Sequence, residues 1–166
     1  MTAQAPPGLR LRALAPGDLG WVISRNGALY AAECNWDETY EAHVAGVLSA
    51  YVLNRDPARS NGWIAELDGE RAGAIFCSPR EGDVAQLRIL HVEPFARGAG
   101  VGTALIDACV TFAREAGYRE ITLWTTVLQR AAIRLYERAG FRLTSEDPPA
   151  RRFGDEIHGQ FWARPL

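Results

Sequence analysis

Residues 97–103 have the sequence Arg-Gly-Ala-Gly-Val-Gly-Thr, and this stretch restricts the fold more than any other part of the 166-residue chain. It lies between a predicted strand, residues 84–92, and a predicted helix, residues 100–116. Closely spaced glycines let a ligand approach the backbone without interference from a Cβ atom. Amides at a helix N-terminus favour an anion, and Arg97 adds a fixed positive charge. The stretch therefore predicts a site for a phosphate or pyrophosphate group.

Three classes of phosphate-bearing ligand use such a loop. A P-loop for nucleoside triphosphates ends in Gly-Lys-Ser/Thr, but Gly102 is followed directly by Thr103. A dinucleotide-binding loop has a third glycine where Thr103 stands, and it belongs to a first βα unit. Here the loop comes late, after a run of predicted antiparallel strands. The loop of this chain therefore fits neither of these two ligand classes well. The third class of ligand is coenzyme A.

The pattern outward from this loop predicts a mixed α/β sheet. Asp68-Gly69 between two apolar runs indicates a hairpin, and Pro94 ends the central strand because proline cannot continue a ladder. We expect a polar loop at 146–159. Strands are expected at 8–13, 62–67, 72–77, 84–92, 120–125, 141–144 and 160–163, and helices at 18–32, 37–53, 100–116 and 129–138.

Length and composition favour one globular domain covering residues 1–166. The net charge of −2 gives no positive field for nucleic acid, and no basic amphipathic stretch or long apolar run indicates a membrane. The three cysteines have no metal-ligand spacing. We therefore expect a cytoplasmic protein with reduced thiols, no metal, no nucleic-acid partner and no membrane partner.

Two segments together resemble the GNAT acetyltransferase superfamily. Residues 90–105, with the Arg-x-x-Gly-x-Gly core at Arg97, Gly100 and Gly102, look like its motif A, and residues 132–141 resemble its motif B. The likeness covers roughly residues 8–166. The N-terminal half also looks like the acetyltransferase half of proteins that fuse a MarR-type regulator to a GNAT domain. The resemblance implies a GNAT fold: a sheet of six to seven strands with a splayed central pair, flanked by about four helices.

The resemblance also implies that acetyl-CoA is the co-substrate. Its pyrophosphate is expected on the amides of the loop, and its pantetheine arm beside the end of the central strand. A glutamine stands where the family commonly has an asparagine. The residues implied in cofactor binding are Leu90, His91, Val92, Arg97, Gly98, Ala99, Gly100, Val101, Gly102, Thr103, Gln129 and Ala132.

The implied reaction is direct attack of a primary amine on the thioester. Tyr136 matches the tyrosine that protonates the departing thiolate, although an apolar helix face would equally place it in the core. Some relatives have a basic carboxylate on the central strand, where this chain has Gln86 and Arg88. His91, Glu33 and Asp37 are the alternatives for the base, each also explained by an ordinary structural role.

The acceptor site is expected opposite the cofactor, between the first two helices and the last loop. Its candidate residues are Glu33, Trp36, Tyr40 and Trp124, with Asp37 and Phe161 beside them. Arg151 and Arg152 could bind a carboxylate, or form a solvated basic pair. The expected acceptor is a small amine or amino acid. The alternatives are a protein N-acetyltransferase and a non-catalytic acetyl-CoA sensor, and a homodimer is compatible because many relatives form one.

Overall fold

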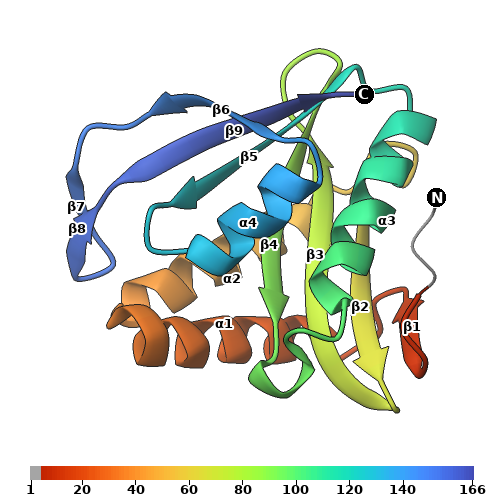
Figure 1. Ribbon diagram of the computed structural model, residues 1–166, viewed down its shortest axis with the longest axis horizontal. Helices are drawn as coiled ribbons and strands as arrows, with labels where there is room; N and C mark the ends of the chain where they lie inside the picture. The colour runs from red at the N-terminus through yellow and green to blue at the C-terminus, as the bar shows by residue number, and fades with distance from the viewer. Residues whose placement is uncertain (1–4) are drawn as a thin grey trace.

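The structure is a computed structural model that describes residues 5–166 (Figure 1). Its helices and strands follow the expected order along the chain. In sequence these are β1 (Leu9–Arg12), α1 (Asp18–Cys34), α2 (Glu38–Leu53), β2 (Asn61–Leu67), β3 (Glu70–Pro79), β4 (Val84–Val92), a 3-10 turn (Pro94–Ala96), α3 (Val101–Glu115), β5 (Glu120–Thr126), α4 (Arg130–Arg138), β6 (Arg142–Glu146), β7 (Ala150–Arg152), β8 (Asp155–Ile157) and β9 (Gly159–Pro165).

Seven strands form one mixed sheet in the order β1-β2-β3-β4-β5-β9-β6. The central strands β4 and β5 pair in parallel only over residues 84–86 and 120–122. Both strands continue beyond this pairing, so they diverge toward the carboxyl end of β4. The expected mixed sheet of six to seven strands with a splayed central pair is confirmed, and the splay opens the sheet where the cavities lie.

The two faces of the sheet carry separate apolar layers. Alternate residues of a strand point to opposite faces, and Ala74 and Ile75 of β3 accordingly belong to different clusters. One cluster packs against α3 and α4, and the other against α1 and α2. The helices in Figure 1 therefore cover the sheet from both sides.

A bulge interrupts β4 beside the opening. Ala74 of β3 pairs with His91, and Phe76 pairs with Arg88, so two residues of β4 face the single residue Ile75. Ile89 has φ of 53°, a conformation that a β-branched residue rarely adopts. Bulges often re-aim a strand next to an active site, and this one lies between Arg88 and Leu90.

Residues 146–159, expected as a polar loop, instead contain the β7–β8 hairpin. Its turn has positive φ at both Phe153 and Gly154, which is the geometry of a type I′ turn. Phe153 is buried against Trp36 and Tyr40. The expectation failed because two buried apolar side chains, Phe153 and Ile157, anchor a segment that is otherwise largely polar.

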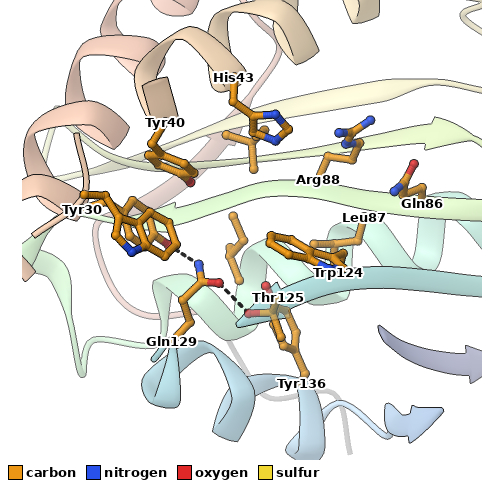
Figure 2. A pocket seen from close by; sticks show the side chains of 13 residues that line it. Tyr30, Tyr40, His43, Gln86, Leu87, Arg88, Trp124, Thr125, Gln129 and Tyr136 are labelled. Atoms are coloured by element: carbon orange, nitrogen blue, oxygen red, sulfur yellow. Dashed lines mark hydrogen bonds between the residues drawn. The ribbon is translucent and has the colours of Figure 1, made fainter. Parts of the chain in front are cut away.

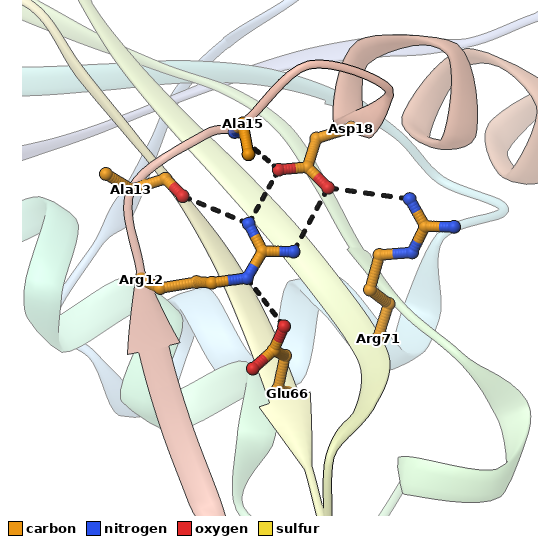
Figure 3. A network of polar contacts seen from close by, with 6 residues as sticks. All are labelled: Arg12, Ala13, Ala15, Asp18, Glu66 and Arg71. Carbon is orange, nitrogen blue, oxygen red and sulfur yellow. Dashed lines mark hydrogen bonds and ion pairs between the residues drawn. The ribbon is translucent and has the colours of Figure 1, made fainter.

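An ion-pair network ties β1, β2 and β3 to the start of α1 (Figure 3). Arg12 lies 2.6 Å from both Asp18 and Glu66, and Arg71 lies 3.4 Å from Asp18. Asp18 is buried and also accepts a hydrogen bond from the Ala15 amide. The bond from Arg12 holds the pKa of the Asp18 carboxyl below its usual 3.8.

Replacing Asp18 with Asn should lower the free energy of unfolding by about 2 kcal/mol at pH 7. A carboxyl whose folded pKa is lowered stabilises the fold above its unfolded pKa, and this contribution disappears as pH falls through the folded value. The deficit of D18N should therefore shrink below about pH 3.8. Urea unfolding at pH 7 and pH 3 tests this. The control is Asp83→Asn, which breaks only an exposed pair with Arg119. A deficit equal at both pH values would contradict the prediction.

Candidate functional site

A cleft of about 580 Å³ lies between α1, the end of β4, the 97–103 loop and α4. Every residue predicted for cofactor binding lines it except Ala99. The amide of Ala99 instead donates to the carbonyl of Ala96 across the preceding turn, at 3.3 Å. The structure therefore brings the predicted loop, the end of the central strand and the start of α4 to one cavity.

The glycines shape the loop beside this cleft. Gly98 and Gly100 have φ of 79° and 82°, a region that other residues rarely adopt. The first backbone hydrogen bond of α3 runs from Ala104 to Gly100, so the amides of residues 101–103 precede the helical ladder. Gly100, as the N-cap residue, has no side chain to accept from them. These donors and the helix dipole are the groups that bind a phosphate.

Cations line the same cleft. Arg97 of the loop pairs with Glu33 of α1 at 2.6 Å and donates to the carbonyl of Val92 at 3.3 Å. Glu33 was expected beside the acceptor, but it lies in the cleft. Three arginines of α4 also line it and were not among the residues expected there, although their spacing of four residues places them on one helix face. These are Arg130, Arg134 and Arg138.

A second, smaller cavity of about 80 Å³ lies among β4, β5, α1, α2 and α4 (Figure 2). Three of the expected acceptor residues line it: Trp36, Tyr40 and Trp124. Trp36 and Tyr40 pack edge to face at 4.7 Å. Its other sides are β4, with Gln86 and Arg88, and α2, with His43. We call this cavity the small pocket.

Gln129 lies where the cleft and the small pocket meet, since it lines both. Its side-chain oxygen accepts from the Thr125 hydroxyl at 2.7 Å and from the Thr126 amide at 3.0 Å. Its side-chain nitrogen donates to the Tyr30 hydroxyl at 2.7 Å. Tyr30 and Leu90 also line both cavities. Gln129 therefore connects β5, α4 and α1 at the junction.

Gln129→Ala removes all three hydrogen bonds at once. We expect the free energy of unfolding to fall by about 1–3 kcal/mol, because partly buried partners are left unpaired. The matched control is Gln160→Ala, whose side chain donates to Glu146 and accepts from the indole nitrogen of Trp162, away from both cavities. Thermal and urea unfolding of both variants make the comparison. Equal small losses would show that Gln129 does not hold the junction together.

Tyr136 of α4 lines the small pocket and is 5% exposed. Figure 2 shows its side chain reaching from α4 toward Thr125. Burial raises the pKa of the Tyr136 phenol, and the neighbouring Tyr30 and Cys109 add to the rise. The phenol is therefore protonated at neutral pH and can donate a proton. Its ring also packs against the ring of Phe141, with 5.9 Å between the ring centroids. Tyr136 is therefore both a core aromatic and a residue of the pocket wall.

None of the three residues considered as a base lines the small pocket. The His91 side chain is buried beside Asn26 and Trp21, and burial lowers its pKa to about 3. Glu33 pairs with Arg97, and Asp37 caps α2 by accepting from the Thr39 amide. The structure therefore places all three away from an acceptor in this pocket.

His43 is the group that sequence analysis overlooked. It lines the small pocket from α2, and burial lowers the pKa of its imidazole, with Arg152 and Arg88 as further causes. It is therefore neutral at neutral pH and can accept a proton. Nothing in its local sequence marked it, because its position depends on the packing of α2 over β4. Phe161 and Arg151, also considered for the acceptor, do not line the pocket.

Within residues 5–166, no helix combines the length and apolar character needed to span a membrane. No group of three or more His, Cys, Asp or Glu side chains in this range could hold a metal ion. The three cysteines are free, and Cys34 lies in the wall of the cleft.

The chain is similar in sequence to known acetyltransferases. A model described as the acetyltransferase (GNAT) family matches residues 20–141. N-acetyltransferase family 8 member 2 of Rattus norvegicus is 33% identical over 75% of this chain and 52% of its own length. N-acetylaspartate synthetase of Danio rerio is 35% identical over 60% of this chain and 35% of its own length. The chain thus spans about a third to a half of these curated relatives.

The fold is also similar to solved structures. An acetyltransferase of the GNAT family from Staphylococcus aureus Mu50 superposes with a TM-score of 0.77, covering 95% of this chain and 99% of its own. The two sequences are 17% identical, so this likeness supports the fold alone.

Proposed function

This chain belongs to the GNAT acetyltransferase family, and from that membership we propose that it is an acetyl-CoA-dependent N-acetyltransferase acting on the primary amine of a small molecule or amino acid. The observation that carries the proposal is the arrangement of two cavities that share Tyr30, Leu90 and Gln129. One cavity has the phosphate-binding loop, and the other has the buried phenol. A cofactor in the cleft would present its acyl end at this junction.

The residues of the cleft fit acetyl-CoA. The loop amides and Arg97 would bind the pyrophosphate, and the α4 arginines add positive charge for the remaining phosphate. The bulge at Ile89 and the splay beyond Gln86 interrupt the pairing of β4, so its backbone can pair with the pantetheine amides. The cavity of about 580 Å³ has the size of an ordinary ligand site.

The chemistry follows from the small pocket. The amine nitrogen attacks the thioester carbonyl, the carbon–sulfur bond breaks, and the thiolate takes the proton of the Tyr136 phenol. The amine must lose a proton, and neutral His43 lies in the same pocket as an acceptor for it. The aromatic side chains Trp36, Tyr40 and Trp124 would exclude water from the reacting atoms.

The proposed class of acceptor rests on the volume of the small pocket and on the name of one relative. The small pocket is about 80 Å³, which suits a small amine better than a polypeptide groove. One relative is by name an N-acetylaspartate synthetase, which supports an amino acid as acceptor. The likeness of the N-terminal half to MarR-fused acetyltransferases, the cytoplasmic location, the single domain over residues 1–166 and the homodimer stay predictions from sequence.

Calorimetric titration with acetyl-CoA, followed by thiol-release assays over a panel of amines and N-terminal peptides, tests the proposal. We expect saturable binding and turnover with small amines. Turnover with peptides alone would favour a protein N-acetyltransferase, and binding without turnover would favour a sensor. Absence of acetyl-CoA binding would refute the cofactor assignment and the proposal with it.

A further inference from the structure

The small pocket has an unbalanced charge. Among the residues that line it there is no Asp or Glu, yet Arg88 of β4 is one of them, with its side chain on the same side of β4 as His43 (Figure 2). Arg88 makes no hydrogen bond or ion pair within residues 5–166, unlike Arg12, Arg25 and Arg97, which each pair with a carboxylate. The guanidinium therefore lies in a cavity without a protein counter-ion.

An unpaired guanidinium in a partly buried place is costly, because it loses part of its hydration without a compensating partner. Burial alone accounts for the lowered pKa of Arg88, with no carboxylate opposing it. A carboxylate that enters the pocket can accept two parallel hydrogen bonds from a guanidinium. The cost of burying Arg88 would then be offset when the ligand is bound.

A second guanidinium lies beside the pocket. Arg152 of β7 stacks over Trp124 at 5.0 Å and over Phe153 at 4.8 Å. It has no carboxylate partner within the described part of the chain. Both Arg88 and Arg152 act on His43, whose pKa they help to lower. Arg88 thus lines the cavity, and Arg152, itself exposed, lies over one of the side chains that line it.

Three carboxylates of neighbouring segments are engaged in other contacts. Glu33, expected to attract a cationic amine, pairs with Arg97 in the cleft. Asp37 accepts from the Thr39 amide at the start of α2. Asp147 accepts from the indole nitrogen of Trp124 at 3.0 Å, on an exposed side. The charges around the pocket therefore select an anionic group and not a second cation.

We propose that the acceptor is a small amine bearing a carboxylate, and that Arg88 binds this carboxylate with support from Arg152 while the amine faces Tyr136. This deepens the proposed N-acetyltransferase function and rests on it. Arg88 is thereby a specificity-determining residue for the acceptor and has no part in holding acetyl-CoA, since it does not line the cleft.

The test uses matched acceptors that differ only in charge: a panel of amino acids, each assayed beside its carboxamide. Thiol release with saturating acetyl-CoA gives KM and kcat for each member. The enzyme should prefer the acid, and Arg88→Met should raise KM for the acid about tenfold or more, with little change for the amide. Arg88→Lys should restore part of the preference. The matched control Arg151→Gln removes an equal charge from β7, outside the lining of the small pocket, and should leave the preference intact.

Calorimetry with acetyl-CoA is run on every variant to separate this inference from the proposed function. Unchanged cofactor affinity in R88M, together with the lost preference, supports the carboxylate site. Turnover that is equal for acids and amides, or acetyl-CoA binding without transfer to any acid of the panel, would overturn the inference while the cofactor assignment stands. Loss of acetyl-CoA binding by the unmodified protein would refute the proposed function itself.

Discussion

Tyr136→Phe should reduce kcat by about 100- to 10,000-fold, the range that a positioned general acid contributes, and leave the affinity for acetyl-CoA unchanged. The substitution removes one hydroxyl and keeps the ring, so the contact with Phe141 survives. Since Tyr136 lines the small pocket and not the cleft, cofactor binding has no reason to change. Thiol-release kinetics and calorimetry on the same preparation measure the two quantities.

The control for this prediction is Tyr51→Phe. Tyr51 is also a buried tyrosine, packed against Phe76 at 5.1 Å, but it lines neither cavity. It should keep nearly full kcat. If Y136F turned over as fast as the parent enzyme, Tyr136 would be a core aromatic, and the thiolate would have to take its proton from water or another group.

The cofactor side was predictable from sequence because its features are local. The glycines at 98, 100 and 102, the proline that ends β4 and the apolar period of α3 all lie between residues 94 and 115, and they specify the end of a strand, a loop and a helix. A binding site made of backbone amides depends little on side chains from distant segments of the chain. Ala99 is the exception, because its amide bonds to the carbonyl of Ala96 at the end of the 3-10 turn.

The acceptor side was less predictable because it is assembled from distant segments. Phe153 anchors the β7–β8 hairpin on Trp36, 117 positions earlier in the chain, and the hairpin then places Arg152 over Trp124. His43 enters the site only through the packing of α2. Glu33 looked free in the sequence, and its partner Arg97 is distant along the chain. The net charge around the acceptor pocket therefore depends on which side chains the tertiary fold pairs with one another, and local sequence patterns do not give it.

Gly100→Val should weaken acetyl-CoA binding by about 100-fold, as measured by calorimetry. Gly100 has φ of 82°, where a residue with a Cβ atom pays about 1–2 kcal/mol and a β-branched one is an outlier. An added Cβ would also lie 3.0 Å from Cγ of Pro6. The backbone would relieve this strain by rotating the amides at the start of α3 away from the phosphate. The loss of two hydrogen bonds to a charged phosphate accounts for the expected fall in affinity.

Gly117→Val separates backbone strain from the loss of the phosphate site. Gly117 follows the other end of α3 with φ of 85°, and an added Cβ there meets no atom within 4 Å. Both variants should lose a similar amount of unfolding free energy, but G117V should bind acetyl-CoA like the parent. If both weakened binding equally, the effect would come from general destabilisation. If neither did, the amides before Ala104 would not be the phosphate donors, and the affinity would have to come from Arg97 and the α4 arginines.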